Sequence, residues 1–126
     1  MKKELSIILP VFNEKDSLPI MVRLLNSTIK FKKEIIIVYD DQNRDDLKYI
    51  ESCIKNDLRV KVIFNDKNKG VAYSRNKAIS IARGEYIAFL DCDDYWENNK
   101  IKSQLNFMTT HDYDFSYTTY KVINNN

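Results

Sequence analysis

The residues EIIIVY, Glu34 to Tyr39, set the fold of this 126-residue chain. The four residues in the middle of the stretch are all apolar, so a strand formed here would bury both of its faces. Strands buried on both faces are typical of parallel sheets that helices cover on both sides. The stretch therefore predicts a strand inside a helix-covered parallel sheet.

Shorter apolar runs on either side alternate with segments of helical period. Further strands are predicted at residues 5–9, 60–64, 86–90 and 115–122. This alternation indicates a single α/β domain: an open, mostly parallel sheet of five strands with helices on both faces and right-handed crossovers. Gly84 is expected to end the third helix as a C-terminal glycine.

Composition narrows the possible partners. Hydrophobic residues make up 44% and charged residues 30%, as in an ordinary globular protein. The formal net charge of +2 is too small to favour nucleic acid as the main partner, and the basic runs 30–33 and 67–69 are interpreted as solvated loops. Cys53 and Cys92 indicate no disulfide framework, so a cytoplasmic location is expected. We see neither a signal peptide nor an apolar run as long as a membrane span.

Polar side chains follow each of the first four predicted strands. Asp40-Asp41 follow the second, Asn65-Asp66 the third and Asp91 to Asp94 the fourth. Ligands of such sheets bind beyond the carboxyl ends of the strands, where these loops meet. Acidic groups that converge there repel one another unless a cation or hydrogen-bond donors compensate. The pattern favours a metal or polar-ligand site.

The sharpest motif is Asp91-Cys92-Asp93-Asp94. Carboxylates two residues apart can place oxygens on a hard divalent cation such as Mg²⁺ or Mn²⁺. Such a cation neutralises a diphosphate and makes it a better leaving group. The same residues are also typical of a turn that caps the next helix, and the motif by itself leaves both interpretations open.

Only two glycines occur, Gly70 and Gly84, which excludes the glycine-rich phosphate loops of P-loop and dinucleotide-binding proteins. A diphosphate would need a metal and basic side chains instead. Arg75, near the start of a predicted helix, is placed for that role, although a surface ion pair is the alternative. We interpret His111 and Trp96 as structural residues, and no Ser/His/Asp set can be assembled.

Four motifs together resemble family 2 inverting glycosyltransferases with the GT-A fold. In chain order they are LSIILPVFNE at 5–14, DDQNRD at 40–45, NKGVAYSRN at 68–76 and GEYIAFLDCDD at 84–94. The later stretches 94–104 and 113–118 are similar to bacterial enzymes that assemble capsular or teichuronic-type polysaccharide. Where the family usually has Gly-Ser after the paired aspartates, this chain has Gln42-Asn43.

The resemblance implies roles in binding a nucleotide-diphospho-sugar, a UDP-sugar in particular. Pro10, Phe12 and Glu14 would line the nucleoside pocket, with Glu14 near the ribose. Asp41 would read the base, usually uracil.

The remaining implied roles concern the diphosphate. Arg75 would approach the base or the diphosphate, Asp91 would contact ribose or sugar, and Asp93 would ligate a divalent metal, Mn²⁺ or Mg²⁺. Residues 1–126 would then be the donor-binding domain of an inverting transferase, truncated before the half that supplies acceptor contacts and the catalytic base. The implied acceptor is a polysaccharide or lipid-linked saccharide, with peripheral association at the inner face of the cytoplasmic membrane.

Two other functions remain as alternatives. One is a non-catalytic nucleotide-binding fragment with the same fold. The other is a receiver-type phosphoacceptor domain, whose acidic pair would follow the first strand, where this chain has Pro10-Val11-Phe12.

Overall fold

The computed structural model describes residues 4–12, 17–42, 44–45, 47–54 and 57–124. The chain divides into two compact units, one ending at Tyr95 and the other beginning at Trp96. We describe each unit by itself.

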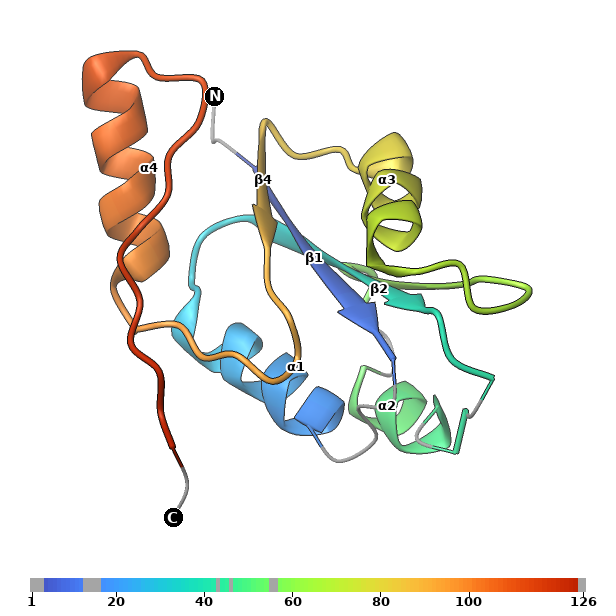
Figure 1. Ribbon diagram of the computed structural model, residues 1–126. Coiled ribbons are helices and arrows are strands. Elements are labelled where there is room, and N and C mark those ends of the chain that lie inside the picture. The colour runs from blue at the N-terminus through green and yellow to red at the C-terminus, as the bar shows by residue number, and fades with distance from the viewer. Residues whose placement is uncertain (1–3, 13–16, 43, 46, 55–56, 125–126) are drawn as a thin grey trace. The chain divides into compact units, whose positions relative to one another are not determined.

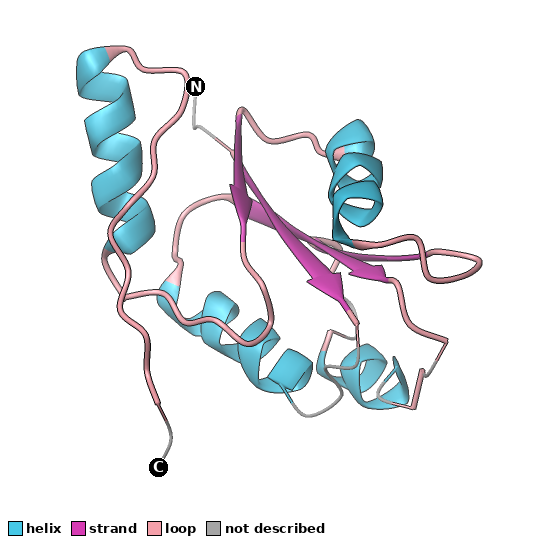
Figure 2. Cartoon of the chain, in the orientation of Figure 1, coloured by secondary structure: helices cyan, strands magenta, loops and turns pink. Residues whose placement is uncertain are grey.

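The first unit holds a sheet of four parallel strands in the order β3-β2-β1-β4, shown in Figures 1 and 2. Its elements are β1 (Leu5–Val11), α1 (Ser17–Thr28), β2 (Lys33–Tyr39), α2 (Leu47–Cys53), β3 (Val60–Phe64), α3 (Val71–Ile81) and β4 (Tyr86–Phe89). The predicted open parallel α/β sheet is confirmed. A receiver domain would place β1 between β2 and β3, whereas β1 here lies between β2 and β4, so that alternative is wrong.

Helices cover both faces of the sheet, as the EIIIVY stretch predicted. Figure 1 shows α1 and α2 on one side of the sheet and α3 on the other. Ile36 and Val38 of β2 pack with Ala78 of α3, while Ile35 and Ile37 alternate with them and are fully buried as well. Each fully buried side chain of this size contributes about 1.5–3 kcal/mol, so β2 is the centre of the core.

The connections explain why the helices divide in this way. From β1 through β2 to β3 the chain moves in one direction across the sheet, and then α3 carries it back past β1 to β4 at the other edge. Because parallel crossovers are right-handed, a reversal of direction moves the connecting helix to the opposite face. Such a reversal leaves a crevice at the carboxyl ends of the strands on either side of it, here β1 and β4.

Gly84 does not end a helix, contrary to the prediction. Helix α3 ends at Ile81, and its cap residue Ala82 is already extended. A Cβ atom on Gly84 would lie 2.5 Å from the backbone nitrogen of Ser6, and the Gly84 N–H donates to the Ser6 hydroxyl at 2.8 Å. The glycine is required because the loop before β4 passes directly against β1.

The second unit contains α4 (Lys100–His111) and an extended segment that follows it. The predicted fifth strand at 115–122 is wrong, because within the described residues this segment pairs with no strand. Its aromatic side chains Phe115, Tyr117 and Tyr120 are exposed by 76%, 88% and 87%. The alternation of polar and apolar residues there indicates an ability to form a strand, but a strand also needs a neighbour to pair with.

Candidate functional site

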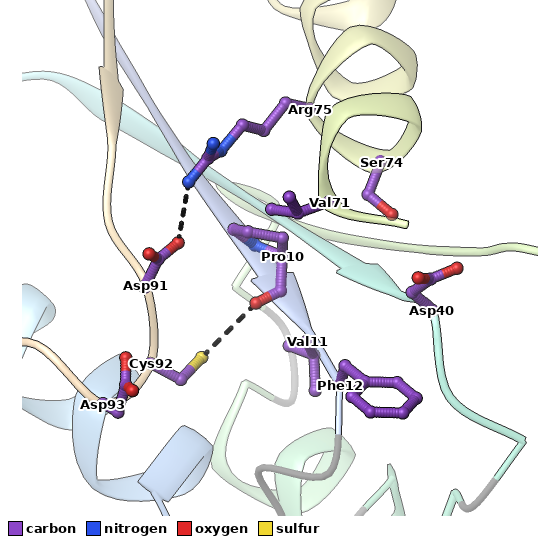
Figure 3. A pocket seen from close by; sticks show the side chains of 10 residues that line it. All are labelled: Pro10, Val11, Phe12, Asp40, Val71, Ser74, Arg75, Asp91, Cys92 and Asp93. Atoms are coloured by element: carbon purple, nitrogen blue, oxygen red, sulfur yellow. Dashed lines mark hydrogen bonds and ion pairs between the residues drawn. The ribbon is translucent and has the colours of Figure 1, made fainter. Parts of the chain in front are cut away.

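A pocket of about 320 Å³ opens where the ends of β1 and β4 meet the start of α3 (Figure 3). It lies at the reversal of strand order, where this class of sheet binds its ligands. The residues that line it are Pro10, Val11, Phe12, Asp40, Val71, Ser74, Arg75, Asp91, Cys92 and Asp93.

Three carboxylates gather in the turn after β4. The Asp94 N–H donates to the Asp91 carbonyl oxygen at 3.0 Å, which folds the chain back. One oxygen atom from each of Asp91, Asp93 and Asp94 then lies within 4.8 Å of the others. Oxygens on one divalent cation, each about 2.0–2.6 Å from it, span distances of this size. The donor set therefore fits a hard cation such as Mg²⁺ or Mn²⁺.

The charges of the turn also favour a bound cation. Partial burial, followed by the neighbouring charges of Asp93 and Asp91, raises the pKa of the Asp94 carboxyl. The turn is not a helix cap, since α4 begins only at Lys100, with Asn99 before it making no side-chain cap bond. Of the two interpretations of the motif, the structure therefore favours the cation site.

Arg75 reaches from α3 to the rim of this turn. Its Nη2 donates to Asp91 Oδ1 at 3.0 Å (Figure 3). Its guanidinium carbon lies 5.8 Å from the centre of the Phe89 ring. The side chains of Arg75 and Asp91 are 35% and 45% exposed, so this ion pair stabilises the fold by at most about 1 kcal/mol. The buried Nε of Arg75 has no hydrogen-bond partner within the part of the chain that the structure describes. A weak pair of this kind leaves the guanidinium able to take an anionic ligand.

The opposite wall comes from the end of β1. Phe12 is 56% exposed, so its ring offers a face to a planar group. Buried Cys92 places its Sγ 4.0 Å from the Pro10 carbonyl oxygen and so holds the acidic turn against β1. The pocket thus has an apolar wall on one side and charged groups on the other.

The structure brings together five of the seven residues singled out from the sequence: Pro10, Phe12, Arg75, Asp91 and Asp93. Asp41 is half-buried and adjoins the pocket without lining it, and Glu14 lies outside the described residues. The roles given to all seven remain predictions.

Asp40, Ser74 and Cys92 also line the pocket, although the sequence assigned no individual role to any of them. Asp40 carried a usable signal, because it directly follows β2 just as the acidic turn follows β4. Ser74 carried none, since a serine inside a helix is common.

The family model for glycosyl transferase family 2 matches residues 6–126. The chain belongs to this family. Membership confirms the resemblance to family 2 glycosyltransferases that the four motifs carry.

Two bacterial relatives are similar to this family 2 chain over nearly all of its length. It is 44% identical over 117 residues to the Escherichia coli UDP-Glc:alpha-D-GlcNAc-diphosphoundecaprenol beta-1,3-glucosyltransferase WfaP, covering 93% of this chain and 46% of that protein. It is 38% identical over 125 residues to the putative teichuronic acid biosynthesis glycosyltransferase TuaG of Bacillus subtilis, covering 97% and 48%. The chain thus spans about half the length of these relatives.

A solved structure supports the fold of this family 2 chain. Residues 1–349 of Staphylococcus aureus TarS, in complex with UDP-GlcNAc, match with a TM-score of 0.71 and 25% identity, over 86% of this chain and 32% of that one. The predicted fold is confirmed. Among the described residues, no helix is both long and apolar enough to cross a membrane.

Proposed function

We propose that these residues form the donor-binding part of an inverting glycosyltransferase. The pocket would hold a nucleotide-diphospho-sugar, with UDP as the nucleotide, together with Mn²⁺ or Mg²⁺. The sugar would pass to a polysaccharide or lipid-linked saccharide. The observation that carries the proposal is the meeting of three carboxylates, an arginine and a helix N-terminus at one pocket.

The charge of the site explains why a cation belongs to the proposal. The three carboxylates of the turn and the guanidinium of Arg75 leave a formal charge of −2 at the turn, and the Asp40 carboxylate adds one more negative charge to the pocket. A diphosphate would be repelled by this pocket as it stands. One divalent cation held by Asp93 with Asp91 and Asp94 offsets the charge, and when bound it supplies the electrostatic stabilisation that a diphosphate leaving group needs.

The chain's own groups would complete the anion site. The first turn of helix α3, whose N-terminal N–H groups carry a partial positive charge, lines the same pocket as Arg75. A guanidinium suits phosphate oxygens because its planar donors match their geometry. Phe12 and Pro10 would pack against the nucleoside, with Asp41 and Glu14 contacting base and ribose. In-line attack by an acceptor hydroxyl also needs a general base, and we assign none within these residues.

The relatives indicate the chemistry of donor and acceptor. WfaP is named for UDP-glucose and a diphosphoundecaprenol-linked sugar, and TarS was solved with UDP-GlcNAc. A UDP-sugar donor and a saccharide acceptor, lipid-linked or polymeric, are therefore the partners that we propose. A lipid-linked acceptor would bring the protein to the inner face of the cytoplasmic membrane as a peripheral protein.

Calorimetry with UDP in the presence of Mn²⁺ tests the proposal. We expect the chain to bind UDP, and Asp93→Ala to weaken binding by at least about tenfold, since even residues that only support a metal ligand are worth 10–100-fold in metal affinity. Asp114→Ala is the matched control, because it removes an exposed carboxylate of the second unit. Folded protein that does not bind UDP, or binding indifferent to Asp93→Ala, would contradict the proposal.

A further inference from the structure

Asp40, at the end of β2, is only 5% exposed, yet its carboxylate is not used in an ion pair among the described residues. Instead it accepts three hydrogen bonds. Its Oδ1 accepts from the backbone N–H of Lys69 at 2.6 Å and from Asn65 Nδ2 at 2.9 Å, and its Oδ2 accepts from the backbone N–H of Gly70 at 2.8 Å. Three of the roughly four acceptor positions of the carboxylate are therefore occupied by the chain itself.

The two backbone donors, Lys69 and Gly70, lie immediately before α3, where the backbone conformation must be restrained. Gly70 is the N-cap residue, with φ 90° and ψ 165°, and it has no side chain of its own with which to cap the helix. A Cβ on Gly70 would meet nothing within 4 Å, so the glycine is required by this backbone conformation and not by crowding. Glycine can adopt many backbone conformations, and hydrogen bonds restrict this one. The N–H groups of Gly70 and of the preceding Lys69 both donate to the Asp40 carboxylate, and these bonds are charge-assisted.

A second set of bonds extends the same restraint into the helix. Asn65 Nδ2 also donates to Ser74 Oγ at 2.9 Å, and that hydroxyl donates to the Gly70 carbonyl oxygen at 3.1 Å. Asn65 and Ser74 are 1% and 0% exposed. The ends of β2 and β3 are thus tied to the first turn of α3 through one buried polar cluster.

That first turn carries one wall of the pocket. Val71, Ser74 and Arg75 all line it, and Arg75 spans to Asp91 on the other side. Because a helix moves as a rigid body, any shift at Gly70 displaces the Arg75 guanidinium relative to the acidic turn.

We propose that Asp40 is a positioning residue for the donor site: through the backbone N–H groups of Lys69 and Gly70 it holds the start of α3, and Arg75 with it, in the arrangement that binds the donor diphosphate. This inference rests on the proposed function. Burial opposes ionisation of Asp40, but the bonds from Lys69, Asn65 and Gly70 outweigh it and lower its pKa, so the carboxylate is charged at neutral pH.

Glu34 offers a matched control within the same strand. It is also a carboxylate with several partners, accepting from Ser6 Oγ at 2.6 Å, the Arg83 N–H at 2.6 Å and Lys61 Nζ at 2.7 Å. It lies at the other end of β2, about 20 Å from Asp40 at 3.3 Å per residue. Glu34→Gln therefore disturbs a comparable cluster without reaching the pocket.

The experiment measures UDP affinity in Mn²⁺, urea stability and amide hydrogen exchange for Asp40→Asn and Glu34→Gln. We expect both variants to be less stable, but only Asp40→Asn to weaken UDP binding, by about 10–100-fold, which is the loss expected when one charge-assisted hydrogen bond from Arg75 to the diphosphate is no longer made. Exchange at Lys69 and Gly70 should quicken in Asp40→Asn alone. UDP affinity within twofold of wild type in folded Asp40→Asn, or an equal loss in Glu34→Gln, would overturn the proposal.

Asn65→Ala gives a second test and covers the case in which Asp40→Asn does not fold. Asn65 is not among the residues that line the pocket, but it donates to both Asp40 and Ser74. We expect weaker UDP binding here too, and unchanged binding would mean that the cluster does not position α3. A wild-type chain that binds no UDP would instead overturn the proposed function itself, which separates the two failures.

Discussion

Replacing Gly84 with alanine tests the packing of the loop before β4 against β1. The added Cβ would lie 2.5 Å from Ser6 N, 2.6 Å from Ser6 Oγ and 2.8 Å from the Tyr86 carbonyl oxygen. Two of these three atoms belong to the backbone of the sheet, so no side-chain rotation relieves the contact. The loop must move, and the Gly84 N–H then leaves the Ser6 hydroxyl that it now meets at 2.8 Å.

The size of the effect follows from these two consequences. Overpacking of this kind costs about 1–3 kcal/mol, and loss of the hydrogen bond adds about 1 kcal/mol. We therefore expect Gly84→Ala to lower the free energy of unfolding by about 2–4 kcal/mol, out of the 5–15 kcal/mol typical of a domain. In urea, with a slope of about 2 kcal/mol per M, the midpoint should fall by about 1–2 M.

Ser6→Ala separates the clash from the hydrogen bond. By itself it should cost about 1–3 kcal/mol, because it removes both the acceptor of the Gly84 N–H and the hydroxyl that donates to Glu34, without adding an atom. In combination with Gly84→Ala it should not restore stability, since the 2.5 Å and 2.8 Å contacts are with backbone atoms. A midpoint for Gly84→Ala within about 0.3 M of wild type, or recovery in the double variant, would show that the loop does not pack as described.

Two further predictions concern acid stability and the segment after α4. Burial opposes ionisation of both Asp40 and Glu34, but hydrogen bonds outweigh it and lower their pKa values below the ordinary 3.8 and 4.5. Because the unfolded chain binds protons more readily at these groups, protonation favours unfolding. The free energy of unfolding should be at its full value above about pH 4.5 and should fall as the pH drops through the lowered pKa values, less steeply in Glu34→Gln. Urea midpoints measured from pH 2 to 7 test this expectation. For the segment, Tyr117→Ser and Tyr120→Ser should change the free energy of unfolding by less than about 0.5 kcal/mol, whereas a buried strand aromatic would cost about 3–5 kcal/mol in the same denaturation assay.

The segment after α4 shows where periodicity stops being informative. Residues 115–122 and β2 both carry the composition of a strand, but β2 is paired on both sides while Phe115 and Tyr117 lie exposed. A strand is a property of two segments, and the sequence of one segment does not state whether its partner is present. For the same reason the strand order β3-β2-β1-β4 cannot be predicted from the pattern of residues within each strand, although the right-handedness of crossovers limits the possible orders.

Asp40 and Asp41 show a second limit of prediction from sequence, which concerns the directions in which side chains point. Both follow β2, and from the sequence they form one acidic pair that is expected at the edge of the sheet where ligands bind. In the structure Asp40 points into the cluster with Asn65 and the start of α3, while Asp41 lies half-buried beside the pocket. Adjacent residues at a strand end face different neighbours, so Asp40 turns toward the start of α3 while Asp41 lies half-buried in a different environment.

Pro10 links the local sequence to the position of the pocket. The sequence predicts a first strand at residues 5–9, which stops before Pro10, but β1 continues through Pro10 to Val11 on the side of β2. On the side of β4, pairing stops at Ile8 with Phe89. Pro10 has no N–H to donate to a longer β4, so it is tolerated only where that neighbour has ended. The two strands separate beyond this point, and the opening between them is where Asp91 meets Arg75. A residue that prevents pairing in the middle of the sheet thus gives the site its space.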